Sequence, residues 1–278
     1  SRFDHKGKVN INYVPSVNKK TMYESYRPLS ITNKTKFNVS SKLDLGHFYA
    51  RASFHFNFKD QEGKFMGLQS YGKYNKAHYK MIKNLKEDTF DKLPTTFDAA
   101  FTCQKYFEDK YLELVKEYKY KNMVFTGGTA LNVVNNYKLK KHFKNYNLWF
   151  DPLCGDVGNS IGAVYAVMYI KSIKPLKNIY LGSEINNFEE QLEKNEKLIK
   201  DVNIDRIIKL LNKGEVVGLI QGKAEAGPRA LGNRSLLLDP TLPNAKDIMN
   251  RIKKREAFRP FACTIIEEKV NKYFDMEK

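Results

Sequence analysis

The segment from Gln221 to Ser235, QGKAEAGPRALGNRS, concentrates residue types that bind anions. Its three cations are Lys223, Arg229 and Arg234. Only one acid, Glu225, stands against them in the segment. Flexible backbone at the glycines, next to guanidinium groups, suits bidentate recognition of a phosphate or a carboxylate. Pairing of an arginine with Glu225 or Asp239 is the structural alternative, but the excess of positive charge favours an anionic ligand.

A second basic segment runs from Asn250 to Phe261, NRIKKREAFRPF. A helix is expected to lead into it, because Asn244 can cap a helix start and Asp247 follows three residues later. The apolar residues expected to face the core are Ile248 and Ile252. The cations at the end of this helix are Lys253, Lys254 and Arg255. Positive charge there complements the helix dipole, which explains them without a ligand. Arg259 lies beyond the helix, so we expect it to bind an anion.

Two further candidate sites lie in glycine-containing loops that follow short apolar runs. In the first loop, Gly127 and Gly128 let backbone N–H groups approach a nucleotide closely. The helix start that follows favours phosphate, and Asn132, one turn later, could hydrogen-bond a ribose or a base. The alternative interpretation is an ordinary tight turn.

The second loop has the sequence GDVGNS, in which Asp156 stands between Gly155 and Gly158. Asn159 or Ser160 can cap the helix that follows. A carboxylate in this position can ligate a hard metal ion that bridges nucleotide phosphates. An ordinary turn aspartate fits the pattern equally well.

The elements that must position these loops alternate between strand and helix. The clearest is a helix over 97–118, in which apolar residues recur every three or four positions. Its expected buried stripe is Phe97, Phe101, Gln104, Phe107, Tyr111, Leu114 and Tyr118. Short strands are expected at 123–125 and 148–150, followed by helices at 130–137 and 161–170. Strand, glycine loop and helix thus occur twice, which is typical of an α/β nucleotide-binding fold.

The remaining segments give weaker patterns. The aromatic-rich run at 45–58 fits a buried helix slightly better than a strand, and the residues before about position 35 fit hairpin strands only poorly. A linker is expected at 171–187, a charged helix at 189–212 and a strand at 216–220.

The chain is strongly basic, with 48 Lys and Arg against 31 Asp and Glu and a net charge of +17. This charge suits polyanionic partners such as nucleic acids or phosphorylated small molecules. Because the lysines are scattered and do not form a dense block, a general abundance of lysine is the simpler explanation.

The three cysteines, Cys103, Cys154 and Cys263, lie far apart, which argues against a zinc cluster and against a disulfide framework. No HExxH pairing occurs among the five histidines. The sequence shows neither a membrane-spanning apolar run nor a signal peptide, so a cytoplasmic protein is expected.

These motifs together resemble one family, the O-carbamoyltransferases that act on nodulation factors, aminoglycosides and cephalosporins. The collinear motifs that carry the resemblance are GGTALN, GDVGNSIGA, GPRALGNRS and REAFRPFA, and the similarity spans roughly residues 42–275. The resemblance implies the second half of an ASKHA-type (Kae1-like) transferase domain at 1–182. It further implies the start of a YrdC-like activating domain at 188–278.

The family resemblance also implies a chemistry and its cofactors. The activating domain would join carbamoyl phosphate to ATP, and the resulting carbamoyl-adenylate would pass to the transferase domain for attack by a substrate hydroxyl. Fe2+ would polarise the adenylate, and Mg2+ is a further candidate metal. The residues of the activating half would be Arg229, Lys253 and Arg259 as catalytic groups around one phosphate-sized pocket, with Lys223, Arg234 and Arg255 binding the cofactor. The residues of the transferase half would be Gly127, Gly128, Asn132 and Gly158 at the adenylate and Asp156 at the metal.

The sequence also departs from the family. Lys223 replaces a usual arginine, Ala224 a usual methionine, and Gln69-Ser70 a usual Ala-Pro. Because lysine lacks the bidentate fork, phosphate affinity at position 223 is in doubt. The histidine pair of the family is absent, so this chain alone is expected to bind metal poorly and not to turn over.

Two alternatives remain open from the sequence. One is threonylcarbamoyl transfer to a tRNA adenosine, which the positive charge would help. The other is a non-catalytic basic protein that retains only the fold. The order of the motifs favours the small-molecule enzymes, so a nucleic-acid partner is not favoured over a small hydroxyl acceptor.

Overall fold

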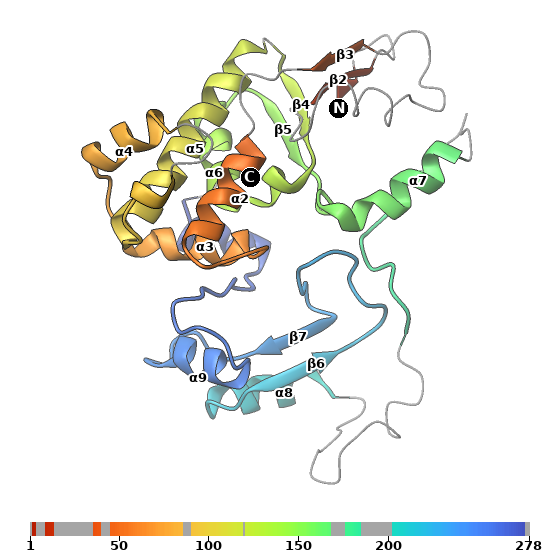
Figure 1. Cartoon of the computed structure of the whole chain (residues 1–278). Coiled ribbons are helices and arrows are strands. Elements are labelled where there is room, and N and C mark those ends of the chain that lie inside the picture. Colours follow the sequence, from red (N-terminus) through yellow and green to blue (C-terminus); the bar gives the residue numbers. More distant parts are fainter. Residues whose placement is uncertain are drawn as a thin grey trace. The chain divides into compact units, whose positions relative to one another are not determined.

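The computed structural model describes most of the chain as two compact units (Figure 1). The described residues are 2–3, 9–13, 36–39, 45–85, 90–118, 120–167, 176–184 and 202–275. Unit 1 comprises residues 1–182 together with 225–229, and unit 2 comprises residues 183–224 and 230–278. Both units contain helices and strands, so the general α/β class is confirmed. The ASKHA-type and YrdC-like identities of the two halves stay predictions.

The core of unit 1 forms where three helices pack together. These helices are α2 (Leu45–His55), α3 (Glu62–Leu68) and α5 (Phe97–Glu117). Helix α5 begins where the Thr96 side chain accepts the Ala99 N–H at 3.2 Å. Helices at 45–55 and 97–117 confirm two sequence predictions, since long apolar periodicity favours buried helices.

The predicted stripe of α5 is partly wrong. Phe97 is 52% exposed, and the buried apolar side chains lie on a face rotated from the predicted one. They are Ala99, Ala100, Cys103, Phe107, Tyr111 and Val115. Small residues at 99, 100 and 103 let α5 approach its neighbours closely, and a pattern based on large apolar residues misses such contacts.

Short helical segments connect these helices. They are η1 (Gln69–Tyr71), α4 (Lys76–Lys83) and η2 (Phe90–Lys92). The Asn75 side chain caps α4 by accepting the N–H groups of Ala77 and His78. At Gly72, a Cβ atom would lie 1.9 Å from the carbonyl oxygen of Phe97, so only glycine fits between η1 and the start of α5.

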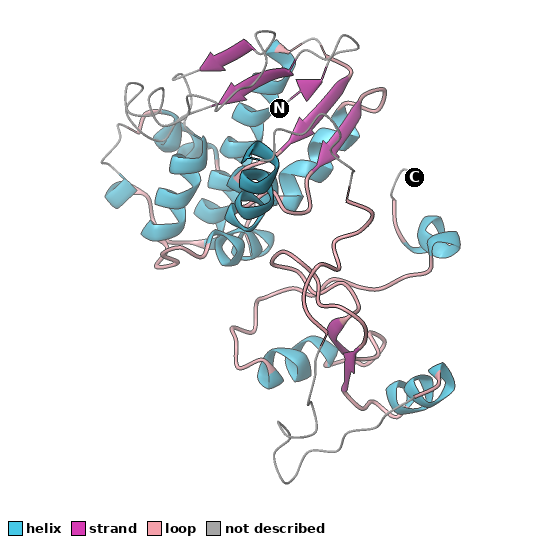
Figure 2. Ribbon diagram, turned by 90° about the vertical axis from the view of Figure 1, so that its right-hand side faces the viewer, coloured by secondary structure: helices cyan, strands magenta, loops and turns pink. Residues whose placement is uncertain are grey.

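Two parallel strands carry the predicted loops. They are β4 (Asn122–Phe125) and β5 (Asn147–Phe150), which pair in parallel with Phe125 opposite Phe150. The connection between them contains η3 (Gly128–Leu131) and α6 (Val133–His142). The single helix predicted at 130–137 is therefore two elements, which meet at Asn132. Figure 2 shows β4 and β5 beside the helices of unit 1.

The remaining strands of unit 1 form a separate sheet. It contains β1 (Arg2–Phe3), β2 (Val9–Tyr13) and β3 (Lys36–Val39), with β1 antiparallel to β2 and β2 parallel to β3. After β5 come η4 (Asp156–Gly158) and α7 (Asn159–Val167). The last residues of the helix predicted at 161–170 lie outside the described residues.

Unit 2 contains an antiparallel pair of strands and several helices. Its elements are α8 (Ile204–Asn212), β6 (Val217–Ile220), β7 (Arg234–Leu237), α9 (Ala245–Ile252), η6 (Glu267–Lys269) and α10 (Val270–Tyr273). Strands β6 and β7 confirm the strand predicted at 216–220 and give it an antiparallel partner. The first part of the helix predicted at 189–212 and most of the predicted linker lie outside the described residues.

The prediction for α9 needs two corrections. Asn244 occupies the N-cap position, but its side chain makes no capping hydrogen bond. Ile252 is 49% exposed, whereas Met249 and Asn250 are the buried residues of this helix. The buried side of α9 therefore contains a polar side chain, which the apolar pattern did not indicate. Among the described residues, no helix combines the length and the hydropathy needed to cross a bilayer.

Candidate functional site

The two glycine-containing loops meet at one end of the β4–β5 pair. Because parallel neighbouring strands point the same way, the chain leaves Phe125 and Phe150 at the same edge. The Asp151 N–H still donates to the Phe125 carbonyl at 3.0 Å, which extends the pairing into the second loop. A Cβ atom at Gly155 would lie 3.5 Å from Leu131, so the two loops are neighbours.

The first loop has open backbone at both glycines. Gly127 has a φ of 88°, a conformation that L side chains rarely adopt, and its carbonyl accepts the Ala130 N–H at 3.0 Å. A Cβ atom built on Gly127 or Gly128 meets no described atom within 4 Å. A ligand can therefore approach this turn without displacing a side chain. The prediction that these glycines hold an adenylate stays a prediction, and the geometry is compatible with it.

Asn132 lies at the end of this turn and is only 6% exposed. It forms a reciprocal amide pair with Gln104: its Nδ2 donates to Oε1 at 3.0 Å, and Gln104 Nε2 donates to its Oδ1 at 3.1 Å. The same Oδ1 accepts the Asn135 N–H at 3.0 Å and so caps α6. The predicted contact of Asn132 with a nucleotide stays a prediction. The structure gives this side chain internal partners that fix the turn.

The amide pair belongs to a larger buried polar network that the sequence analysis missed. Gln104 also donates to Glu108 Oε1 at 2.8 Å and accepts the Tyr49 hydroxyl at 2.6 Å, while Lys138 pairs with Glu108. Burial raises the pKa of Tyr49 well above its usual value, so the phenol keeps its proton and acts as a donor. The available signal was a glutamine inside an apolar stripe, with a glutamate four residues later.

In the second loop, Gly158 has a packing role. A Cβ atom there would lie 2.2 Å from the carbonyl oxygen of Leu153, so the loop closes only with glycine at this position. The Asp151 carboxylate accepts the Leu153 N–H at 2.8 Å and holds the same turn. The prediction that Gly158 binds a cofactor stays untested, and its close backbone contact gives it a sufficient structural reason.

Asp156 is exposed at the start of η4. Among the residues that the structure describes, no group of three or more His, Cys, Asp or Glu side chains could hold a metal ion. Iron bound by protein needs several such donors together, so the described residues do not fit an iron site. The assignment of Asp156 as a metal ligand stays a prediction.

The segment 225–229, which carries Arg229, belongs to unit 1. The Ala226 N–H donates to the Ile179 carbonyl at 2.7 Å, and a Cβ atom at Gly227 would lie 3.0 Å from Leu153. Burial raises the pKa of Cys154, and the nearby Arg229 cation opposes that rise. Arg229 is therefore close to the loop that contains Asp156.

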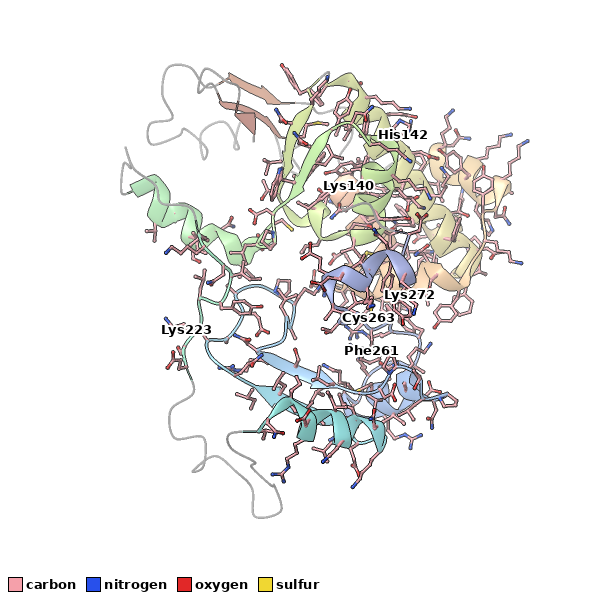
Figure 3. All side chains as sticks on the ribbon, turned by 180° about the vertical axis from the view of Figure 1, so that it is seen from behind. Lys140, His142, Lys223, Phe261, Cys263 and Lys272 are labelled. Atoms are coloured by element: carbon pink, nitrogen blue, oxygen red, sulfur yellow. The ribbon has the colours of Figure 1, made fainter. Side chains whose placement is uncertain are left out.

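In unit 2, Arg234 holds the loop between β6 and β7 together. Its guanidinium donates to the carbonyls of Gln221 at 2.8 Å, Gly222 at 3.0 Å and Asn233 at 2.8 Å. The Asn233 side chain in turn donates to the Lys223 carbonyl, while Lys223 is exposed (Figure 3). The predictions that Lys223 and Arg234 bind the cofactor stay untested. For Arg234 the geometry supports a structural role.

A second cationic group follows α9. Asn250 is 2% exposed and donates to the carbonyls of Ala257 and Arg259, while its Oδ1 accepts Arg255 Nε at 2.7 Å. Burial lowers the pKa of Arg255, and the positive charge of Arg259 lowers it further. The Glu256 carboxylate opposes this shift, and it lies 3.9 Å from the Arg259 guanidinium, so an acid of the same segment already faces these cations. Lys253 is exposed at the end of the same helix.

Arg229 belongs to unit 1, whereas Lys253 and Arg259 belong to unit 2. The convergence of these three residues on one pocket stays a prediction.

The loops of unit 1 and the cationic segments around β7 and α9 lie in regions that match two models of one protein family. Residues 93–165, which contain α5, the glycine turn and the Asp156 loop, match the model described as Carbamoyltransferase N-terminus. Residues 208–278, which contain both cationic segments, match the model described as Carbamoyltransferase C-terminus. The chain belongs to the carbamoyltransferase family. The chain contains parts of both the N-terminal and the C-terminal family regions.

Several proteins are similar to this chain. An uncharacterized protein of Synechocystis sp. is 33% identical over 202 residues, which cover 65% of this chain and 33% of that protein. An uncharacterized protein of Methanocaldococcus jannaschii is 33% identical over 292 residues, covering 88% and 56% respectively. Nodulation protein NolNO of Sinorhizobium fredii is 34% identical over 170 residues, covering 56% and 25%. The chain thus matches from a quarter to just over half of the length of these relatives.

Proposed function

We propose that this chain is part of an ATP-dependent O-carbamoyltransferase, which activates a carbamoyl group as its adenylate and transfers it to a hydroxyl. The observation that carries the proposal is the meeting of the Gly127–Gly128 turn and the Asp151–Gly158 loop at one end of β4 and β5. This arrangement offers open backbone to a nucleotide in a chain that matches both carbamoyltransferase models.

The activation step would use the cations of unit 2. Water releases phosphate from carbamoyl phosphate and leaves carbamate, whose oxygen then attacks the α-phosphorus of ATP. The new bond is a phosphorus–oxygen bond to the carbamate, and pyrophosphate leaves with the electron pair. Arg259, whose guanidinium lies 3.9 Å from the Glu256 carboxylate in the free protein, would bind the anions in place of this partner, and Arg255 would hold its segment. Lys253 would add a third positive charge at the end of α9.

The transfer step would take place at the loops of unit 1. The acceptor oxygen attacks the carbonyl carbon of carbamoyl-adenylate, a carbon–oxygen bond forms, and AMP leaves as the proton of the hydroxyl is released. The open turn at Gly127 and Gly128 would bind the nucleotide through backbone N–H groups. Arg229, which lies near Cys154 in the same unit, would place positive charge beside the leaving phosphate.

Binding measurements test this proposal without knowledge of the acceptor. Calorimetric titration of the chain with carbamoyl phosphate should detect binding. Arg259→Met should weaken it by roughly ten- to a hundredfold, because a charge-assisted hydrogen bond contributes about 1.5–3 kcal/mol. Arg206→Met removes an exposed cation of α8 and serves as the matched control, with unchanged affinity. Absence of binding to both carbamoyl phosphate and ATP would contradict the proposal.

A second candidate function is threonylcarbamoyl transfer to tRNA, which the net charge of +17 favours. Binding of tRNA with a steep dependence on salt concentration, together with no binding of carbamoyl phosphate, would support this alternative.

A further inference from the structure

The buried network beneath the glycine turn connects three helices to one end of the turn. Tyr49 comes from α2, Gln104 and Glu108 come from α5, and Lys138 comes from α6. Gln104 is 1% exposed and makes four hydrogen bonds to side chains of this network. It therefore stands at the centre of the network.

The two-way pairing of Gln104 with Asn132 restrains the position of Asn132. In a buried reciprocal amide pair, rotation of either side chain leaves two polar groups without partners, at a cost of about 1–3 kcal/mol for each group. Glu108 and Tyr49 further restrain Gln104, because the first accepts from Nε2 and the second donates to Oε1. The amide of Asn132 consequently has one orientation.

The position of Asn132 in turn determines the end of the glycine turn. Its backbone N–H donates to the Thr129 carbonyl at 3.1 Å, and Ala130 N–H donates to the Gly127 carbonyl. Its side chain caps α6 through the Asn135 N–H. The turn from Gly127 to Leu131 thus has a flexible glycine start and a firmly held end.

We propose that Gln104 is a positioning residue, which fixes the glycine turn through Asn132 so that the turn is preorganised for a nucleotide. The part of this inference that concerns the nucleotide rests on the proposed function, whereas the part that concerns the turn does not. Gln104 itself does not touch the ligand. Preorganised N–H donors bind an anion more tightly because no ordering is required on binding.

Gln104→Glu is the sharpest test, because it keeps the shape and removes only the Nε2 donor. The new carboxyl group would face Asn132 Oδ1 and the buried Glu108, with Tyr49 and Lys138 as the other titratable neighbours. Two adjacent buried carboxylates raise the pKa of one of them, so a proton bound at lower pH restores a donor. The new carboxyl group can restore at most one of the two donations that Nε2 makes, so we expect its pairing with Asn132 to be looser at about pH 8, where it has no donor, than at about pH 6.

Amide hydrogen exchange measures this effect without a ligand. After correction for the intrinsic pH dependence, the amides of Ala130, Asn132 and Asn135 should exchange about tenfold faster in the variant at about pH 8 than at about pH 6. Thr102→Val is the matched control, since Thr102 is a buried polar residue of the same helix that is bonded to Asp98 and Asn75. Wild type and control should show no such pH dependence. Unchanged exchange in Gln104→Glu, or equal acceleration in Thr102→Val, overturns the inference.

A second measurement connects the turn to the nucleotide. Titration with ATP should give about tenfold weaker binding for Gln104→Met and for Asn132→Leu, and the double variant should lose no more than either single variant. Additive losses would mean that the two residues act separately, which contradicts positioning through Asn132. If wild type binds no ATP although the exchange result holds, the proposed function fails while the positioning role of Gln104 stands.

Discussion

The guanidinium carbon of Arg255 lies 4.1 Å from the centroid of the Phe261 ring, while its Nε donates to Asn250. Its NH2 group also donates to the Pro260 carbonyl at 3.3 Å. One planar cation therefore joins the end of α9 to the chain that follows Arg259. In this structure Arg255 holds the segment that contains Arg259 against the end of α9. The resemblance to the family predicted Arg255 as a cofactor ligand, and that role stays a prediction.

Arg255→Lys should separate these two roles. Lysine keeps the charge but loses the planar fork and the stacking, so we expect the free energy of unfolding to fall by about 1–2 kcal/mol. The affinity for carbamoyl phosphate should fall as well, because Arg259 is no longer held. Chemical denaturation and calorimetry measure the two effects, and Arg251→Lys on the exposed side of α9 is the control. Weaker binding with unchanged stability would instead support direct contact between Arg255 and the ligand.

Gly128→Ala tests the approach of a nucleotide to the glycine turn. A methyl group there meets no described atom within 4 Å, so folding should be unaffected. The same methyl group would stand where ligand atoms approach the backbone, and we expect ATP affinity to fall roughly tenfold. Gly63→Ala, at another glycine with open surroundings, should leave ATP binding unchanged. Equal affinities for the two variants would place the nucleotide away from this turn.

Gly72→Ala should destabilise unit 1 strongly. The added Cβ atom would lie 1.9 Å from the Phe97 carbonyl oxygen, so η1 or the start of α5 must move. We expect a loss of about 3 kcal/mol, measured by urea denaturation. Gly162→Ala in α7 meets no described atom, and a glycine-to-alanine change inside a helix typically stabilises it by about 0.5–1 kcal/mol. A neutral Gly72→Ala would show that the contact between η1 and α5 is not formed in solution.

Thiol labelling should distinguish the three cysteines. Cys263 is exposed, whereas Cys103 and Cys154 are buried, and burial raises the pKa of both buried thiols. A raised pKa means less thiolate at neutral pH, so both should react at least about a hundredfold more slowly than Cys263. Labelling with a thiol-specific reagent in native buffer should modify Cys263 first, and Cys263→Ser should abolish the fast phase. Rapid labelling that persists in Cys263→Ser would contradict the buried positions.

Local apolar patterns predicted much of the secondary structure. The strands at 123–125 and 148–150 appear as β4 and β5, because short apolar runs ended by glycine loops or turns favour strands. The structure adds that the two strands are parallel, which the helical connection between them allows. The burial of α5 could not be predicted in detail, since the position of each neighbouring helix depends on small residues such as Ala99 and Ala100.

The contacts of the candidate site residues could not be predicted from the sequence, for a physical reason. A sequence indicates which side chains carry charge, but it does not show which backbone carbonyls will surround them. Arg234 therefore looked like a phosphate ligand, although three carbonyls of its own loop accept from it. Gln104 was assigned to an apolar stripe for the converse reason, because its partner Asn132 is distant in the sequence.

Residues 225–229 belong to unit 1, although the residues on both sides of them belong to unit 2. The backbone therefore enters unit 1 a second time after it has left it. A gene cut after residue 182 would separate Leu153 from the glycine at 227 that packs against it, and would remove Arg229 from the Cys154 loop. The two units are consequently not separable by a single cut in the chain. A version of the protein that expresses unit 1 alone would have to include residues 225–229 as well.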